Sequence, residues 1–373
     1  MKSIPYVRVL LVILAVVGIA IWYKSHNSPG AGTGTGSSVF SPAGQQQNAD
    51  AVTVTGLVGG EKLGYLADPQ VISILKDKYG ITVNATKEGS IDMVKGDSKG
   101  QDFLWPSSQV ALELYKERGG KMVKNDTIFS SPIVFYSWAP VVDALIKQHL
   151  VTKIGPSYYI ADFPKLMGVI NRGTQWKDIG LPDLYGKITI RTTDPTASNS
   201  GMEFSGLLAN VVNGDVVTEA SLPKTVPVVK TFFAHLGYMQ VSSGDLFDQF
   251  ITQGEGQNPI IVGYENQLTE YTLAHPDYAD TIRQQIRIVY PRPTVWSDHP
   301  MIALTPNGAK LLDALKNDPD LRRLAWDGHG FRTGLRNDPK TLQVVGIPET
   351  IQNVVPMPRP RIMESIIKSL STN

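Results

Sequence analysis

Apolar and polar residues repeat along the chain with two different periods, one typical of strands and one typical of helices. Short runs rich in β-branched residues, such as 52–58 and 81–86, are typical of strands. Segments with apolar residues at every third or fourth position, such as 69–79 and 307–316, are typical of helices. Because the two kinds of segment follow each other in turn, the sequence predicts an α/β fold with a mainly parallel sheet.

A polar stretch near the middle of the chain is the first candidate for a site. Residues 186–191 alternate as a short strand does, a polar turn follows, and a helical apolar pattern extends to residue 212. The first turn of a helix carries unpaired N–H donors and the positive end of the helix dipole, so it can hold an anion or another polar group. The same pattern also fits an ordinary capped helix. The candidate ligands from this stretch are Ser198, Asn199, Ser200 and Gly201.

The N-terminal residues have a different pattern from the rest. Residues 7–23 are apolar apart from Arg8, and Lys2 and Arg8 lie on the N-terminal side. This pattern predicts an uncleaved signal anchor over residues 1–24, a single transmembrane helix, with a cleaved signal peptide as the alternative. Residues 25–50 are rich in Gly, Ser, Thr and Gln, which predicts a flexible linker. We therefore expect the globular body, residues 51–373, on the extracytoplasmic side of a cell membrane.

The composition is that of a globular protein without thiols. The chain has 373 residues, of which 42% are hydrophobic and 18% charged, enough for two lobes with cores of their own. The formal net charge of +1 argues against nucleic acid as a partner. The absence of Cys excludes disulfides, Cys-based metal sites and lipid attachment to a Cys.

The sequence lacks the common catalytic and metal-binding motifs. Its six His residues are isolated, and it has no H-E-x-x-H, G-x-S-x-G or Walker pattern. It therefore predicts no catalytic residue, no metal site, no cofactor and no enzyme. A hydrolase is an alternative only if a His lies within reach of Ser107 or Ser200 in the folded chain.

Four short motifs follow one another along the body of the chain. Residues 52–62 give a strand and a small-residue turn, and residues 102–108 (Asp-Phe-Leu-Trp-Pro-Ser-Ser) give a strand and a Ser-rich helix start. Residues 186–201 begin with Gly-Lys-Ile-Thr-Ile, and residues 306–331 contain two late helices. In their order and spacing, these motifs resemble type II periplasmic (extracellular) solute-binding proteins, in particular the molybdate- and sulfate-binding group.

The resemblance implies a two-lobed fold in which two strands cross between the lobes. The first lobe would contain residues 52–135 and 290–373, and the second residues 138–285. A solute would bind in the cleft, and the lobes would close around it. Together with Glu265, which would lie near the cleft, the candidate site residues are Gly60, Glu61, Ser107, Ser108, Ser131, Ser198, Asn199, Ser200, Gly201 and Tyr264.

The resemblance also implies a role in transport. The expected function is that of a membrane-tethered protein that captures a small polar solute for an ABC-type transporter. Molybdate or sulfate is the preferred solute, but carboxylates at Glu61 and Glu265 would repel a dianion, so an amine-bearing solute or a polyol stays open. Trp105 could stack on a solute or pack in the core. The alternative function is a sensor or adaptor of the cell envelope with the same fold and no transporter.

Overall fold

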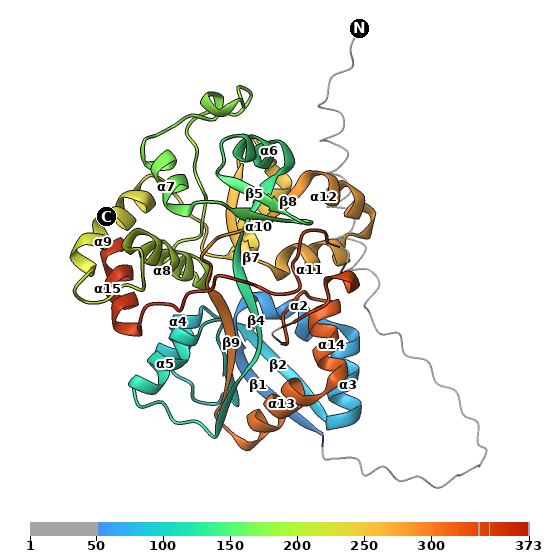
Figure 1. Ribbon diagram of the computed structural model, residues 1–373. Coiled ribbons are helices and arrows are strands. Elements are labelled where there is room, and N and C mark those ends of the chain that lie inside the picture. The colour runs from blue at the N-terminus through green and yellow to red at the C-terminus, as the bar shows by residue number, and fades with distance from the viewer. Residues whose placement is uncertain (1–50, 335, 343, 372–373) are drawn as a thin grey trace, which may run out of the picture. The chain divides into compact units, whose positions relative to one another are not determined.

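The computed structural model describes residues 51–334, 336–342 and 344–371 (Figure 1). The predicted signal anchor (1–24) and linker (25–50) lie outside these residues. Within the described part of the chain, no helix combines the length and the apolarity that a bilayer crossing requires.

The first half of the body is a sheet covered by helices on both faces (Figure 1). Its elements are β1 (Val52–Val58), η1 (Gly60–Lys62), α2 (Leu63–Ala67), α3 (Pro69–Tyr79), β2 (Ile81–Lys87), α4 (Ser90–Lys95), β3 (Phe103–Trp105), α5 (Gln109–Glu117), β9 (Trp296–Ala303), α13 (Pro306–Asn317) and α14 (Pro319–Asp327). β1 pairs in parallel with β2 and β3, and β3 pairs with β9 in the antiparallel sense. Phe103 and Trp105 pack with α3, α13 and α14, whereas Leu104 points to the other face and packs with α4 and α5.

The second half has its own strands and a larger set of helices. Its elements are α6 (Ala139–Lys147), β5 (Val151–Ile154), β6 (Ser157–Ile160), α7 (Phe163–Asn171), η2 (Trp176–Ile179), α8 (Asn199–Asn213), α9 (Leu222–Ala234), α10 (Ser243–Gln253), β7 (Ile260–Tyr264), α11 (Asn266–Ala274), η3 (Pro276–Tyr278), α12 (Ala279–Gln285) and β8 (Ile286–Tyr290). β6 pairs in parallel with β8 and in the antiparallel sense with β5. Its core joins strand residues such as Ile261 and Ile288 to Phe204 and Leu207 of α8.

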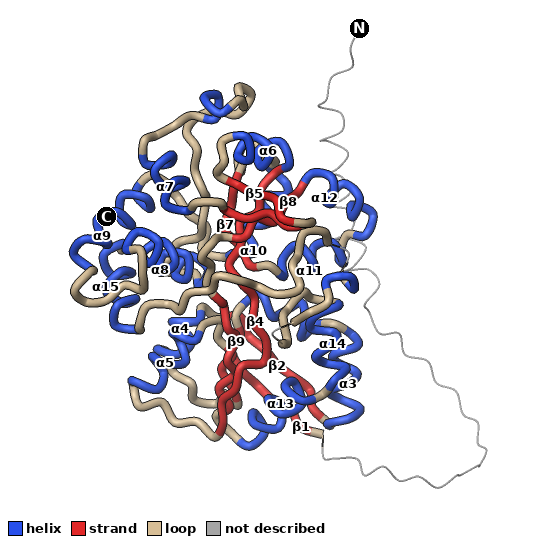
Figure 2. The backbone as a smooth tube through the Cα atoms, viewed as in Figure 1, coloured by secondary structure: helices blue, strands red, loops and turns tan. Residues whose placement is uncertain are grey.

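A single long strand belongs to both halves. β4 (Lys124–Trp138) pairs with β9 along residues 124–132, then with β7 and β8 along residues 133–138, always in the antiparallel sense. Figure 2 shows the strands, in red, extending through the middle of the body from one half into the other. Because β4 is shared, a change in the relative orientation of the halves must bend this strand, together with the connections from β8 to β9 and from α14 to α15.

The prediction of a mainly parallel sheet is wrong. Among the strand pairs of the described residues, three are parallel and five are antiparallel. The reason is that β4 and β9 return through the middle of the body, a long-range path that a local pattern of strands and helices does not reveal. Residues 186–191 do not form the predicted strand either, since they make only isolated bridges, from Lys187 to Gln175 and from Arg191 to Ile261.

Helix ends agree with the signals in the sequence. The Asp68 carboxylate caps α3 by accepting a hydrogen bond from the Gln70 N–H at 2.7 Å, and Gly80 ends the helix with a φ of 64°. α8 begins directly after Ser198, as predicted. The polar stretch in the middle of the chain is therefore a helix N-terminus, the geometry that its candidate site requires.

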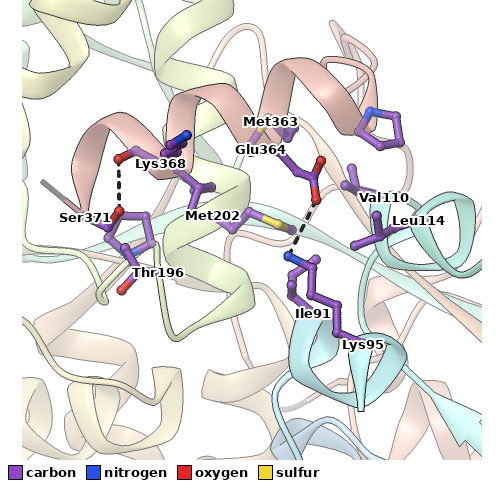
Figure 3. Close-up of a pocket in the computed structure, with 13 residues that line it drawn as sticks. Ile91, Lys95, Val110, Leu114, Thr196, Met202, Met363, Glu364, Lys368 and Ser371 are labelled. Atoms are coloured by element: carbon purple, nitrogen blue, oxygen red, sulfur yellow. Dashed lines mark hydrogen bonds and ion pairs between the residues drawn. The ribbon is translucent and has the colours of Figure 1, made fainter. Parts of the chain in front are cut away.

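The C-terminal helix α15 (Pro360–Leu370) lies against both halves, after a connection that contains the short helix η4 (Pro339–Thr341). Its apolar face buries Ile362, Met363 and Ile366 beside α8 and α9. Its Glu364 forms an ion pair with Lys95 of α4 at 3.5 Å, next to a groove of about 400 Å³ (Figure 3). The sequence placed this tail with the first lobe, whereas the helix packs mainly on helices of the second half.

Gly308 in the first turn of α13 provides a test of packing in the first half. A Cβ at this position would lie 2.0 Å from the backbone oxygen of Asp102, so Gly308→Ala must displace the helix. We expect a loss of about 1–3 kcal/mol of stability, measured as a lower Tm by circular dichroism. Gly256→Ala is the matched control, because a Cβ there meets no atom within 4 Å. Equal Tm values for the two variants would contradict this packing.

Candidate functional site

A cavity of about 290 Å³ lies between the two halves of the body. One wall consists of η1, the connection from β2 to α4, and Ser107, and the other of the first turn of α8, the segment that enters α10, the end of β7, and α11. Two contacts cross from one half to the other beside it. Asn199 donates to the backbone oxygen of Ser107 at 3.0 Å, and Lys87 Nζ donates to Ser242 Oγ at 3.4 Å. The two halves are therefore in a closed arrangement.

The cavity brings together about half of the candidate residues. Those on its walls are Gly60, Glu61, Ser107, Ser198, Asn199 and Tyr264. Those away from its walls are Ser108, Ser131, Ser200, Gly201 and Glu265. Three of the second group directly follow a wall residue in the sequence. The motifs thus predict the correct loops around the cavity, but some of the predicted residues in these loops do not line it.

The candidates behind the wall hold helices in place. Ser108 caps α5 by accepting a hydrogen bond from the Val110 N–H at 3.2 Å. The buried hydroxyl of Ser200 lies 2.8 Å from that of Thr193. Gly201 packs so closely on the Thr193 backbone that a Cβ would lie 2.4 Å from its oxygen. These three residues fix the positions of α5 and α8 rather than facing the cavity.

Glu265 belongs to a buried ion pair behind the cavity. Arg332 donates to its two oxygens at 2.6 and 2.9 Å, and Tyr290 donates its hydroxyl proton at 2.6 Å. Ser131, also buried, donates to Asn266 Oδ1 at 3.3 Å. The Glu265 charge, expected from the sequence to repel an anion, is therefore neutralised by Arg332 and turned away from the cavity.

A fully buried lysine lies under the first wall. Lys62 Nζ donates to Ser107 Oγ at 2.8 Å and to His299 Nδ1 at 3.2 Å, and it forms a close ion pair with Glu61. Ser107 also donates to the same Glu61 oxygen. This arrangement uses all three N–H bonds of the ammonium group, as the burial of a charge requires.

The pKa shifts of this cluster follow from burial and from the ion pair. Burial raises the pKa of Glu61, but Lys62 and then His299 outweigh it and bring the value down to about 2, so the carboxylate stays ionised. Burial lowers the pKa of Lys62, and Glu61 offsets part of that effect. Burial also lowers the pKa of His299 well below its usual value, and Lys62 adds to this effect while Glu61 opposes it. Every contact of Glu61 uses Oε1, which leaves Oε2 for the cavity.

Asn199 is the centre of a second polar network. Its Nδ2 donates to the Ser107 oxygen and to the Tyr264 hydroxyl, each at 3.0 Å. One turn later on α8, Glu203 is fully buried, and among the described residues neither of its carboxyl oxygens has a hydrogen-bond partner. Burial raises the pKa of Glu203 well above its usual value, and the neighbouring Asn199 and Ser297 side chains offset only part of that effect, which favours the uncharged carboxyl.

Sequence reasoning missed Lys62, Glu203 and His299. Lys62 could have been found, because it directly follows the candidate Glu61. His299 could not, because it is 237 residues away from Lys62 in the sequence. Trp105, for which the sequence left two roles open, is fully buried and donates to the His299 backbone oxygen at 3.1 Å, so it is a core residue below the cavity.

The other charged groups on the walls are mostly acidic. Lys87 stands opposite Asp245 and Asp248 of α10, and Glu88 and Glu270 lie farther along the walls. Burial raises the pKa of Asp248 and that of Glu270. A cation, or the positive end of a zwitterion, would therefore be attracted to this part of the cavity.

Two helices present their N-termini to the same cavity. α8 begins after Ser198 and α10 after Ser242, and neither N-cap side chain makes a capping hydrogen bond. The N–H groups of their first turns are open to an acceptor supplied by a solute. The start of α8 thus offers donors, whereas the start of α10 carries both N–H donors and the Asp245 carboxylate.

Comparison with solved structures identifies the fold. HitA from Pseudomonas aeruginosa, in its iron-bound form, is 13% identical, with a TM-score of 0.56 over 86% of this chain and 97% of its own. The Trichodesmium protein IdiA (FutA), solved with iron and citrate, is 11% identical, with a TM-score of 0.52 over 86% of this chain and 98% of its own. The periplasmic binding protein P5PA is 13% identical, with a TM-score of 0.50 over the same shares. No protein-family model and no curated protein matches the chain.

At these identities the similarity shows the fold alone. The predicted fold of type II periplasmic solute-binding proteins is confirmed for the body of the chain. The similarity does not single out the molybdate and sulfate group, and the transmembrane helix stays a prediction.

The hydrolase alternative lacks the contact that it requires. Among the described residues, the Ser107 hydroxyl bonds to Glu61 and Lys62, and the Ser200 hydroxyl to other serine and threonine hydroxyls. Nor do the described residues contain a group of three or more His, Asp or Glu side chains placed to hold a metal ion. The cavity is a set of hydroxyls, amides, backbone donors and carboxylates, which suits reversible binding of a polar molecule.

Lys62→Met tests the buried ion pair. The substitution leaves the Glu61 carboxylate buried without its cation, so we expect a loss of roughly 3–5 kcal/mol of stability in chemical denaturation. Adding Glu61→Gln should restore most of this loss, because the unpaired charge is then gone. Lys116→Met, at an exposed position of α5, is the matched control. A Lys62→Met variant as stable as this control would contradict the role assigned to the pair.

The ion pair of Glu61 and Lys62 also predicts how the stability depends on pH. Glu61 has a folded pKa of about 2 against an ordinary value of 4.5, so its contribution is complete above pH 4.5 and is lost as the pH falls toward 2. The difference in stability between the wild-type chain and Lys62→Met should therefore shrink over that range. Denaturation curves recorded between pH 4.5 and pH 2 measure this difference. A difference that stayed constant over this range would contradict the lowered pKa of Glu61.

Proposed function

We propose that the chain is a membrane-tethered, extracytoplasmic solute-binding protein that captures a small polar solute for an ABC-type transporter. The observation that carries the proposal is the cavity of about 290 Å³ between the two halves, with polar groups from both on its walls. A solute held by both halves stabilises the closed arrangement in proportion to its contacts with each. The similarity in fold to periplasmic solute-binding proteins supports the same role.

The chemistry of the walls narrows the class of solute. The N-terminus of α8, which has no acidic residue in its first turn, suits an acceptor such as a carboxylate or a phosphate. Glu61 and Asp245 suit a donor that carries positive charge. A bare oxyanion such as molybdate or sulfate would accept from the α8 N-terminus but would be repelled by wall carboxylates such as Asp245. We therefore infer a compact zwitterion, with an acceptor group and an amine, in preference to the oxyanion.

The tether and its location rest on the sequence. An apolar segment over residues 7–23 with positive charges on its N-terminal side favours an anchor, and residues 25–50 favour a linker. An anchored binding protein delivers its solute at a high effective concentration to a permease in the same membrane.

A sensor or adaptor of the cell envelope is the second candidate. It is favoured by α15, which packs on α8 and α9 and is ion-paired to α4 of the other half. A helix that contacts both halves can report their closure to a partner. The neighbouring genes discriminate between the two functions, because a permease and an ATPase support transport.

A thermal-shift screen of the full chain in detergent tests the proposal. The panel contains amino acids, amines, oxyanions, polyols and sugars. A solute at a hundred times its Kd stabilises the folded state by roughly 2.7 kcal/mol, which raises Tm by a few degrees. We expect zwitterions to give the largest shift. A shift from oxyanions alone would restore the molybdate or sulfate class, and no shift from any class would favour the adaptor.

Variants then locate the site by calorimetric titration of the best solute. We expect Tyr264→Phe and Asp245→Asn each to raise its Kd by about tenfold, since each removes one hydrogen bond or charge. Tyr185→Phe and Asp143→Asn, at exposed positions, are the matched controls. An unchanged Kd in both site variants would mean that the solute binds elsewhere.

A further inference from the structure

A histidine bridges the two halves at the edge of the cavity. His329 Nε2 lies 3.1 Å from Asp68 Oδ2, and His329 Nδ1 lies 3.0 Å from Glu270 Oε1. Asp68 and His329 belong to the first half, at the start of α3 and after the end of α14. Glu270 lies on α11 of the second half and on the cavity wall. The imidazole is thus held between one carboxylate from each half.

The surroundings fix the two carboxylates. Asp68 Oδ1 is engaged in capping α3, and Glu270 Oε2 accepts from Asn266 Nδ2 at 3.4 Å. α2 and α11 approach so closely that a Cβ on Gly64 would lie 2.9 Å from Glu270 Oε1 (Figure 1). The exposed fractions are 12% for the His329 side chain and 24% for that of Glu270. A charged contact so far from solvent responds more strongly to protonation than one on the surface.

Other ionisable groups face this contact from each neighbouring element. From α2, the Tyr65 ring packs edge-on against the imidazole at 5.4 Å, and its hydroxyl donates to a backbone oxygen. From η1, the ionised Glu61 acts on Glu270. From α14, Asp327 lies two residues before His329 and has Arg323 as a partner at 4.0 Å. The field around the imidazole is therefore set mainly by the two carboxylates in contact with it.

We propose that His329 is a proton-dependent latch that holds the two halves closed over the cavity. A protonated imidazole donates to Asp68 and Glu270 at once. A neutral imidazole has one N–H, so it can donate to one carboxylate while its lone pair faces the other. Loss of the proton therefore turns one attractive contact into a repulsive one and favours opening. The latch would regulate opening of the cavity. This inference rests on the proposed function, because opening controls access only if the cavity binds a solute.

The direction of the pH dependence follows from the pKa shift. Burial lowers the pKa of His329, but Glu270 and then Asp68 outweigh it and raise the value above 6.5. Opening removes Glu270, so the pKa of His329 is lower in the open form than in the closed one. Closure is therefore favoured below the open-form value and is lost as the pH rises through the closed-form value. Each pKa unit between the two forms changes the closed-to-open ratio by about tenfold.

The absence of native Cys makes the motion directly measurable. Cysteines introduced at the exposed positions Lys76 and Asp277 carry spin labels on opposite sides of the latch, one on α3 and one on η3. Double electron–electron resonance on the full chain in detergent then gives the distance distribution without any solute. We expect the short-distance fraction to fall from about pH 6 to about pH 9. His329→Gln should abolish this transition.

Two further variants serve as a control and as a test of the charge on Glu270. His235→Gln, at an exposed position after α9, should leave the transition unchanged. Glu270→Gln keeps a hydrogen-bond acceptor but removes the charge across the halves, so it should move the midpoint to lower pH. A wild-type distance distribution that is constant over the range, or a transition that persists in His329→Gln, would overturn the latch. Because the labels report motion without solute, this result is independent of whether the cavity binds the proposed zwitterion.

Discussion

Burial of the Lys62 ammonium group is the constraint on which the cavity depends. A buried cation is tolerated only with a counterion and a full set of acceptors, and here these come from Glu61, Ser107 and His299. The three partners belong to η1, to the residues after β3, and to β9. One charge thus fixes how three segments meet below the wall, and it holds the Glu61 carboxylate ionised beside the cavity.

The shared strand β4 limits how the two halves can move relative to each other. β4 is hydrogen-bonded to β9 in one half and to β7 and β8 in the other, so the halves cannot separate, although they can tilt. The buried pair of Glu265 and Arg332 lies close to this crossing and ties the end of β7 to the segment after α14. Motion is therefore directed to the cavity side, where the contacts between the halves include the polar ones from Asn199 to Ser107 and from Lys87 to Ser242.

Local signals in the sequence were sufficient for most helices, for strands such as β1 and for the loops of the site, but not for the course of the sheet. Helix starts at Ser198 and Pro69 and strands such as β1 could be read from caps and periodicity. The antiparallel course of β4 and β9 could not, because it depends on pairing between residues far apart in the chain. The same reason explains why Glu61 was predicted and His299 was not. Glu61 lies in a turn that the sequence marks, whereas His299 contacts Lys62, which is 237 residues away in the chain. Which of two adjacent residues faces the cavity, as with Ser107 and Ser108, depends on helix rotation that a motif does not encode.

The contacts across the cavity fall into two kinds that respond to different signals. Asn199 donates its amide hydrogen to the Ser107 backbone oxygen, and Lys87 donates to the Ser242 hydroxyl. A solute that reaches the walls competes for these donors and acceptors, so its binding changes these two contacts. The contact of His329 with Glu270 has the opposite character, since its strength depends on one proton and it lies at the rim. Because both kinds of contact act on the same closure, solute binding and protonation of His329 are linked: each favours the closed arrangement and thereby favours the other.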